Sequence, residues 1–176
     1  MNKNVLKWEL FGILVISIIG SLLHFVFEWA GKWPPVGAIA AVNESVWEHF
    51  KIAFWPALFY AFLEFAIIRN STKNFAIAKA VGIYTMPAVI AIIFYSYTSI
   101  IGHEILAVDI SSFIAAIAIG QLVSYKILTS NQLPSWTKRL GIILLILLAA
   151  AFIVFTYIPP PLPVFQDGPT GNYGIL

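Results

Sequence analysis

The sequence predicts an all-α, polytopic membrane protein: a bundle of five transmembrane helices that forms a single domain over residues 1–176. Hydrophobic residues make up 60% of the 176 positions and charged residues only 10%, whereas globular proteins are about 45–50% apolar. Crossing a hydrocarbon core of about 30 Å takes about 20 apolar residues. Five segments of the chain reach or approach this length.

The first two predicted spans cover residues 11–27 and 43–68. Lysines precede the first one, as in a signal peptide, but no small-residue cleavage site follows, so we interpret it as a retained helix. The second is the least regular, because it contains Pro56 and Glu64. Asn43 is a favourable N-cap for it, and Pro56 is predicted to kink it.

The remaining spans, predicted at residues 75–97, 105–128 and 140–157, are more uniformly apolar. A proline-rich tail, residues 158–176, follows the last span. Its polyproline stretch favours an extended arm. This arm could fold back as a strap over the neighbouring end of the bundle, with Asp167 as a further ligand, or lie as a plain interfacial tail.

The distribution of charge predicts the orientation. Basic residues are enriched on the cytoplasmic side of membrane proteins. With a cytoplasmic N-terminus, eight of the ten lysines and arginines fall on that side, namely Lys3, Lys7, Arg69, Lys73, Lys79, Lys126, Lys138 and Arg139. All three histidines and six of the eight acidic residues fall on the other side, and Glu9 and Glu64 are the exceptions. Five spans then place the C-terminus outside the cell membrane.

Several classes of function are excluded by what the chain lacks. Without cysteine it has no disulfide, thiolate metal site or cysteine nucleophile. A net charge of +2 is too small to indicate nucleic acid as a partner. The expected partners are the lipid bilayer and a lipid-linked or small polar ligand.

The most informative polar segment is residues 43–49, Asn-Glu-Ser-Val-Trp-Glu-His. On a helix, Glu44, Ser45, Glu48 and His49 would share one wide polar stripe. One interpretation is a hydrated interfacial helix in which Lys51 pairs with a glutamate. The other is a site where the glutamates bind a divalent cation or act as acid and base beside His49. A Ser45–His49 nucleophile–base pair lacks an identified orienting carboxylate.

Two further positions complete the predicted site. His24 and Glu28 lie one turn apart, a spacing that suits either a metal or a simple hydrogen-bonded pair. The short loop after them brings this pair close to the segment 43–49. We therefore predict His24, Glu28, Glu48 and His49 as ligands of a divalent metal.

Asp109 precedes Ser112, Ala116 and Gly120, which are small residues on one face of the fourth span. Small residues let membrane helices approach closely, and an acid on such a face is a candidate functional group. The predicted catalytic residues are Glu44, Glu48, His49 and Asp109. His103 and Glu104, in the loop before this span, are interpreted as solvated.

These motifs together resemble a family of small prokaryotic multi-pass membrane proteins known only as a domain of unknown function. The resemblance rests on His24…Glu28-Trp29, residues 43–49 with Lys51, Asp109-Ile110, Gln121…Ser124-Tyr125-Lys126 and the ending Gly171-Asn172-Tyr173-Gly174. It covers nearly the whole chain. It implies an architecture and no activity.

Three functions fit the sequence. The first is a membrane-embedded hydrolase or transferase that uses the Glu/His/Asp cluster, with or without a divalent metal. The second is a component that binds or transports a cation or small polar ligand. The third is an accessory subunit of a membrane complex.

Overall fold

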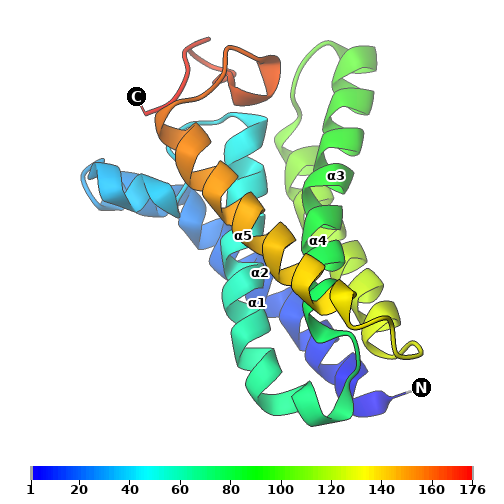
Figure 1. Cartoon of the computed structure of the whole chain (residues 1–176). Helices are drawn as coiled ribbons and strands as arrows, with labels where there is room; N and C mark the ends of the chain where they lie inside the picture. Colours follow the sequence, from blue (N-terminus) through cyan, green and yellow to red (C-terminus); the bar gives the residue numbers. More distant parts are fainter. Residues whose placement is uncertain (1, 176) are drawn as a thin grey trace.

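The computed structural model describes residues 2–175 and confirms the all-α class. Met1 and Leu176, the outer limits of the predicted domain and tail, lie outside the described residues. Five α-helices follow one another, and the described residues contain no β-strand (Figure 1). They are α1 (Lys3–Trp29), α2 (Val46–Ile68), α3 (Phe75–Ile101), α4 (Leu106–Leu128) and α5 (Trp136–Tyr157). All five are long and apolar enough to cross a membrane.

The start of α2 differs from the predicted one. The helix begins at Val46, and its N-cap is Ser45, whose hydroxyl accepts a hydrogen bond from the amide of Glu48 at 3.4 Å. The prediction of Asn43 as the cap was wrong. The Asn43 side chain instead accepts from the amide of Ser45 at 2.9 Å and donates to the carbonyl of Gly174 at 2.7 Å. The polar segment is therefore split between a loop and the first turn of a helix.

The centre of the bundle is apolar, and α2 is its most buried helix. One core cluster draws buried side chains from all five helices, among them Ile16, Phe54, Met86, Ile117 and Phe152. Many large apolar side chains on the outside of the bundle are exposed. This is the pattern expected when the solvent around the helices is lipid.

Helices α3 and α4 approach each other closely through small residues, as the seam on the fourth span predicts. A side-chain carbon built at Gly82 would lie 2.7 Å from the carbonyl oxygen of Gly120, and one at Gly120 would lie 2.6 Å from that of Gly82. Neither position has room for a larger residue. This contact sets the close spacing of α3 and α4, the helix on which Asp109 lies.

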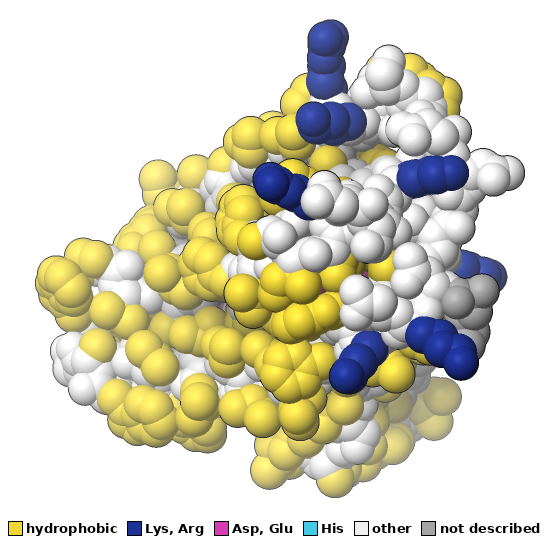
Figure 2. Space-filling model, turned by 90° about the horizontal axis from the view of Figure 1, so that it is seen from below, with side chains coloured by type: hydrophobic (Ala, Val, Ile, Leu, Met, Phe, Trp, Pro, Cys, Tyr) yellow, Lys and Arg dark blue, Asp and Glu magenta, His cyan; other side chains and the backbone are white. Residues whose placement is uncertain are grey.

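The two ends of the bundle differ in chemistry. The end that we call the basic end carries the N-terminus and the connections α2–α3 and α4–α5, and lysines and arginines gather on it (Figure 2). The opposite end, here the tail end, carries residues 30–45, residues 102–105 and the C-terminal tail, which folds back over the bundle (Figure 1). All three histidines of the chain lie at the tail end.

Candidate functional site

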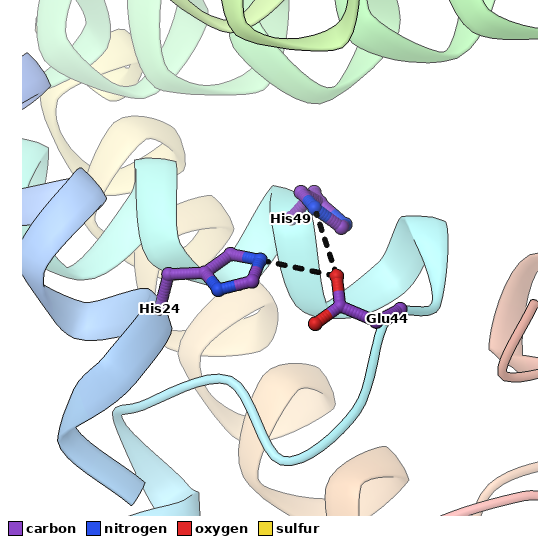
Figure 3. Close-up of side chains that lie close together, drawn as sticks. All are labelled: His24, Glu44 and His49. Carbon is purple, nitrogen blue, oxygen red and sulfur yellow. Dashed lines mark ion pairs between the residues drawn. The ribbon is translucent and has the colours of Figure 1, made fainter. Parts of the chain in front are cut away.

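His24, Glu44 and His49 converge at the tail end. His24 lies near the end of α1, Glu44 in the loop before α2, and His49 in the first turns of α2. Glu44 Oε2 is 3.2 Å from His24 Nε2 and 3.9 Å from His49 Nε2 (Figure 3). One ligand atom from each residue lies within 4.8 Å of the others.

The backbone of α2 orients His49. Its Nδ1 atom lies 2.9 Å from the carbonyl oxygen of Ser45. Because a carbonyl only accepts hydrogen bonds, Nδ1 carries a proton, and in the neutral ring the lone pair is then on Nε2, the nitrogen that faces Glu44. Histidines that bind metals usually have their second nitrogen held in this way.

The tail holds the loop that carries Glu44. Asp167 Oδ1 accepts from the amide of Glu44 at 2.8 Å, and Oδ2 accepts from the amide and hydroxyl of Thr170 at 3.0 and 2.6 Å. Asp167 is only 3% exposed. Since both its oxygens have partners, the structure gives Asp167 a positioning role in place of the predicted ligand role.

Phe165 fixes the tail on the bundle. Its ring centroid lies 4.8 Å from that of Trp47 and 5.5 Å from that of Phe155. Aromatic pairs at such distances contribute about 0.5–1.5 kcal/mol each beyond their area burial. The tail is therefore the strap that the sequence allowed.

The carboxylates at the tail end differ in electrostatic state. The hydrogen bond from His24 lowers the pKa of Glu44, although partial burial opposes this effect. Glu44 is thus ionised at neutral pH, and its pairing with His24 is lost as the pH falls through this lowered value. Burial raises the pKa of Glu104, and the charge of Asp109 adds to this.

These side chains line a pocket of about 530 Å³. His24, Glu44, His49, Glu104 and Asp109 form its polar part, and its apolar walls include Ile90, Phe94, Leu106 and Phe113. Tyr97 donates to Asp109 Oδ1 at 2.6 Å. Four of the predicted residues thus meet in one pocket: His24, Glu44, His49 and Asp109.

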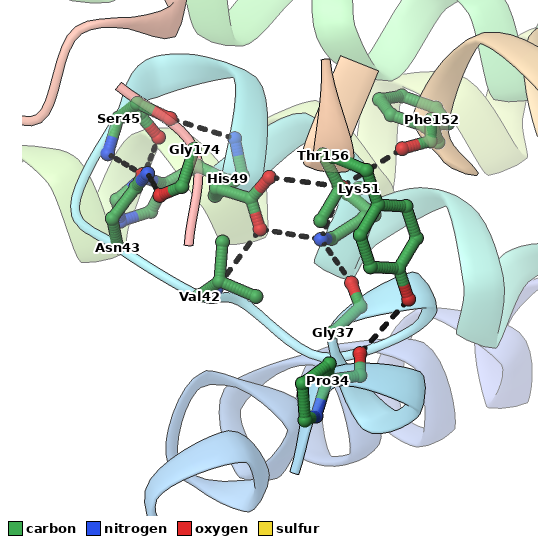
Figure 4. A network of polar contacts seen from close by, with 12 residues as sticks. Pro34, Gly37, Val42, Asn43, Ser45, His49, Lys51, Phe152, Thr156 and Gly174 are labelled. Atoms are coloured by element: carbon green, nitrogen blue, oxygen red, sulfur yellow. Dashed lines mark hydrogen bonds and ion pairs between the residues drawn. The ribbon is translucent and has the colours of Figure 1, made fainter. Parts of the chain in front are cut away.

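Glu48, predicted as a ligand and as a catalytic group, lies elsewhere. Its Oε2 is 2.5 Å from Lys51 Nζ, and the lysine also donates to the carbonyl of Gly37 at 2.6 Å and to Thr156 at 2.8 Å (Figure 4). Glu48 also accepts from the amide of Val42 at 3.0 Å. This buried network ties the loop before α2 to α5.

Glu28, the other predicted ligand outside the cluster, is paired with Lys32 at 3.4 Å, and both side chains are exposed. His103 is exposed and lies outside the residues that line the pocket. Glu104 is exposed, as the sequence suggested, and it also lines the pocket. Its closeness in sequence to Asp109 was the one feature from which its place in the pocket could have been predicted.

Two imidazoles and a carboxylate are a ligand set that catalytic zinc sites use, with a fourth position left open. In tetrahedral zinc coordination, bonds of 2.0–2.1 Å place neighbouring ligand atoms about 3.3 Å apart. The observed separations from Glu44 Oε2, 3.2 and 3.9 Å, are close to this value. All three ligand atoms lie within 4.8 Å of one another, so they would have to move closer together to coordinate one ion.

Comparisons with known proteins identify the family and no activity. No curated protein and no solved structure matches the chain. A family model matches residues 1–175 and confirms the resemblance to a family of unknown function. The chain belongs to the family of unknown function DUF6512.

Proposed function

We propose that this protein is a metal-dependent hydrolase of the cell membrane, which binds a divalent cation of the zinc type through His24, Glu44 and His49. The observation that carries the proposal is the convergence of their three ligand atoms within 4.8 Å at the wall of a pocket. Imidazole favours zinc and related transition metals over magnesium and calcium.

The proposed orientation places the basic end in the cytoplasm and the site at the extracytoplasmic surface. The lysines and arginines around the N-terminus and the connections α2–α3 and α4–α5 support this orientation. The substrate would then be reached from outside the cell or from the outer leaflet.

Besides the three proposed metal ligands, the pocket contains groups that could accept a proton and bind the substrate. A bound zinc-type ion supplies a Lewis acid and lowers the pKa of a coordinated water. Glu104 suits the role of proton acceptor, because desolvation by partial burial raises its pKa. Asp109 is held by Tyr97 and suits the binding of a polar group.

The walls of the pocket indicate an amphipathic substrate. Phe94, Leu106 and Phe113 provide apolar surface beside the charged cluster. A substrate with a hydrolysable polar group and an apolar chain, such as a lipid-linked compound, matches this division. Transport is less well supported, because the apolar core cluster, with Ile16, Met86 and Ile117, lies between the pocket and the basic end.

Titration with zinc tests the proposal. The purified, chelator-treated full chain should bind one equivalent of zinc at neutral pH, measured by calorimetry. Binding should weaken as the pH is lowered, because imidazole must be neutral to bind metal. Glu28→Gln should bind zinc as wild type does, since Glu28 pairs with Lys32. Absence of binding, or loss of binding in Glu28→Gln, would contradict the site described here.

Asp167→Ala tests the role of the strap. Removing the carboxylate frees the amide of Glu44, so the loop no longer holds Glu44 toward the histidines. Loss of such a supporting contact typically lowers metal affinity about 10–100-fold, and we expect a decrease in this range by zinc calorimetry. Asp167→Asn keeps an acceptor oxygen and should recover part of the affinity. Equal affinities in wild type and Asp167→Ala would show that the strap does not position Glu44.

A further inference from the structure

A second group of ionisable side chains lies inside the bundle, towards the basic end. Glu9 of α1, Glu64 of α2 and Lys79 of α3 meet there, and they are 0%, 0% and 3% exposed. Lys79 Nζ is 2.7 Å from Glu9 Oε1 and also contacts Glu64 Oε2. This triad belongs to candidate membrane spans and has no part in the pocket at the tail end.

The charges of the triad do not balance if all three groups are ionised. Two carboxylates and one ammonium carry a net charge of −1. In contrast, the buried pair of Glu48 and Lys51 is neutral. An uncompensated buried charge is strongly unfavourable, and such a group takes up or loses a proton instead. One added proton makes the triad neutral.

Hydrogen bonding distinguishes the two carboxylates. Glu9 Oε1 accepts from Lys79 at 2.7 Å and from the hydroxyl of Ser124 at 2.8 Å. Glu9 Oε2 has no hydrogen-bond partner among the described residues, and neither oxygen of Glu64 has one, so Glu64 has only its ion-pair contact with Lys79. Two donors stabilise the ionised form of Glu9, so Glu64 is the acid that holds the proton.

The surroundings of Glu64 support a neutral acid. The titratable groups near it are Glu9 of α1, Lys79 of α3 and Tyr60 of its own helix. From α4, neutral Ser124 and Gln121 reach Glu9. A groove of about 720 Å³ reaches Lys79; its walls are mostly apolar, including Phe62 and Leu145, and the charged Lys138 also lines it. Glu64 does not line this groove and is 0% exposed, so little water is available to solvate its carboxylate.

We propose that Glu9, Glu64 and Lys79 form a proton-binding site within the membrane spans, which holds one proton on Glu64 at neutral pH. The bound proton removes the net charge between α1, α2 and α3 and so stabilises their packing at the basic end. Release of the proton leaves a negative charge in the span. The site therefore links the proton concentration to helix packing, independently of any metal at the tail end.

Infrared difference spectroscopy of the full chain in detergent tests the proposal. Spectra recorded between neutral and alkaline pH should show loss of the carbonyl band of a protonated carboxylic acid in wild type. Glu64→Gln should lack this band, and the exposed control Glu28→Gln should keep it. No band in wild type at neutral pH, or an unchanged band in Glu64→Gln, would overturn the proposal.

Glu9→Gln shows whether Glu64 is protonated because of the charge balance of the triad or only because it is buried. Without the Glu9 carboxylate, Glu64 becomes the only counter-ion of Lys79, so it should ionise and the band should again disappear. A band that persists in Glu9→Gln would overturn the charge-balance argument. Unfolding gives a second readout. Between about pH 4.3, the pKa of a free glutamate, and neutral pH, folding of wild type takes up one proton, so its unfolding equilibrium constant should rise up to tenfold per pH unit more than that of Glu64→Gln. Equal slopes would also overturn the proposal.

Discussion

Glu48→Leu is expected to destabilise the protein by about 3–5 kcal/mol, the usual cost of removing one partner of a buried ion pair. The side chain of Lys51 is 0% exposed and would lose its counter-ion. The amide of Val42 would also lose its acceptor. Thermal or denaturant unfolding in detergent, followed by circular dichroism, measures the change.

Two controls show whether charge is the cause. In Glu48→Leu/Lys51→Leu no charge remains in this network, so part of the lost stability should return, although Gly37 loses its donor. Glu28→Leu breaks an exposed pair with Lys32 and should change stability by less than about 1 kcal/mol. If the double variant is less stable than Glu48→Leu, the pair stabilises the loop through its hydrogen bonds and not through charge neutralisation.

The architecture was predictable because it depends on apolar length alone. Each candidate span is a long and predominantly apolar segment, and no long-range contact is needed to recognise it. Helices α1, α3 and α5 extend beyond their predicted spans, whereas α2 and α4 do not. Helix α1, for example, begins at Lys3, where the side chain of Asn2 caps it. Polar residues at a helix end contribute little hydropathy, and they were therefore left out of the predicted span.

The location of the candidate site could be predicted from the sequence, but only some of its residues could. The gathering of histidines and acids at one end follows from the order of the spans. The choice between Glu44 and Glu48 depends on where α2 begins. Asn43 and Ser45 are both good caps, and Asn43 is engaged by Gly174, 131 positions along the chain. Local sequence does not contain that contact.

The triad of Glu9, Glu64 and Lys79 also depends on contacts that local sequence does not contain. Glu9 and Glu64 stood out in the sequence as the two acids on the basic side of the charge distribution. Their common partner, Lys79, was only one of the eight basic residues predicted to lie on the cytoplasmic side. Only the packing of three helices shows that the lysine lies between two carboxylates.

His49→Ala is expected to lower the affinity for zinc more than about 100-fold, more than the loss expected for a supporting residue. The change removes one of the three ligand atoms. Asp167 holds the loop that carries Glu44, so Glu44 cannot move to supply a second ligand atom in place of the lost imidazole. His24→Ala should have an effect of the same size. Calorimetric titration of the purified full chain measures both.

His103→Ala is the matched control, since it removes an exposed histidine at the same end of the bundle that does not line the pocket. It should bind zinc as wild type does. Glu44→Gln keeps the size of the side chain and removes its charge, so a loss of affinity there assigns the carboxylate to the metal and not to loop packing. If His103→Ala and His49→Ala weaken zinc binding equally, the ion binds to surface histidines, and the cluster of His24, Glu44 and His49 is not a metal site.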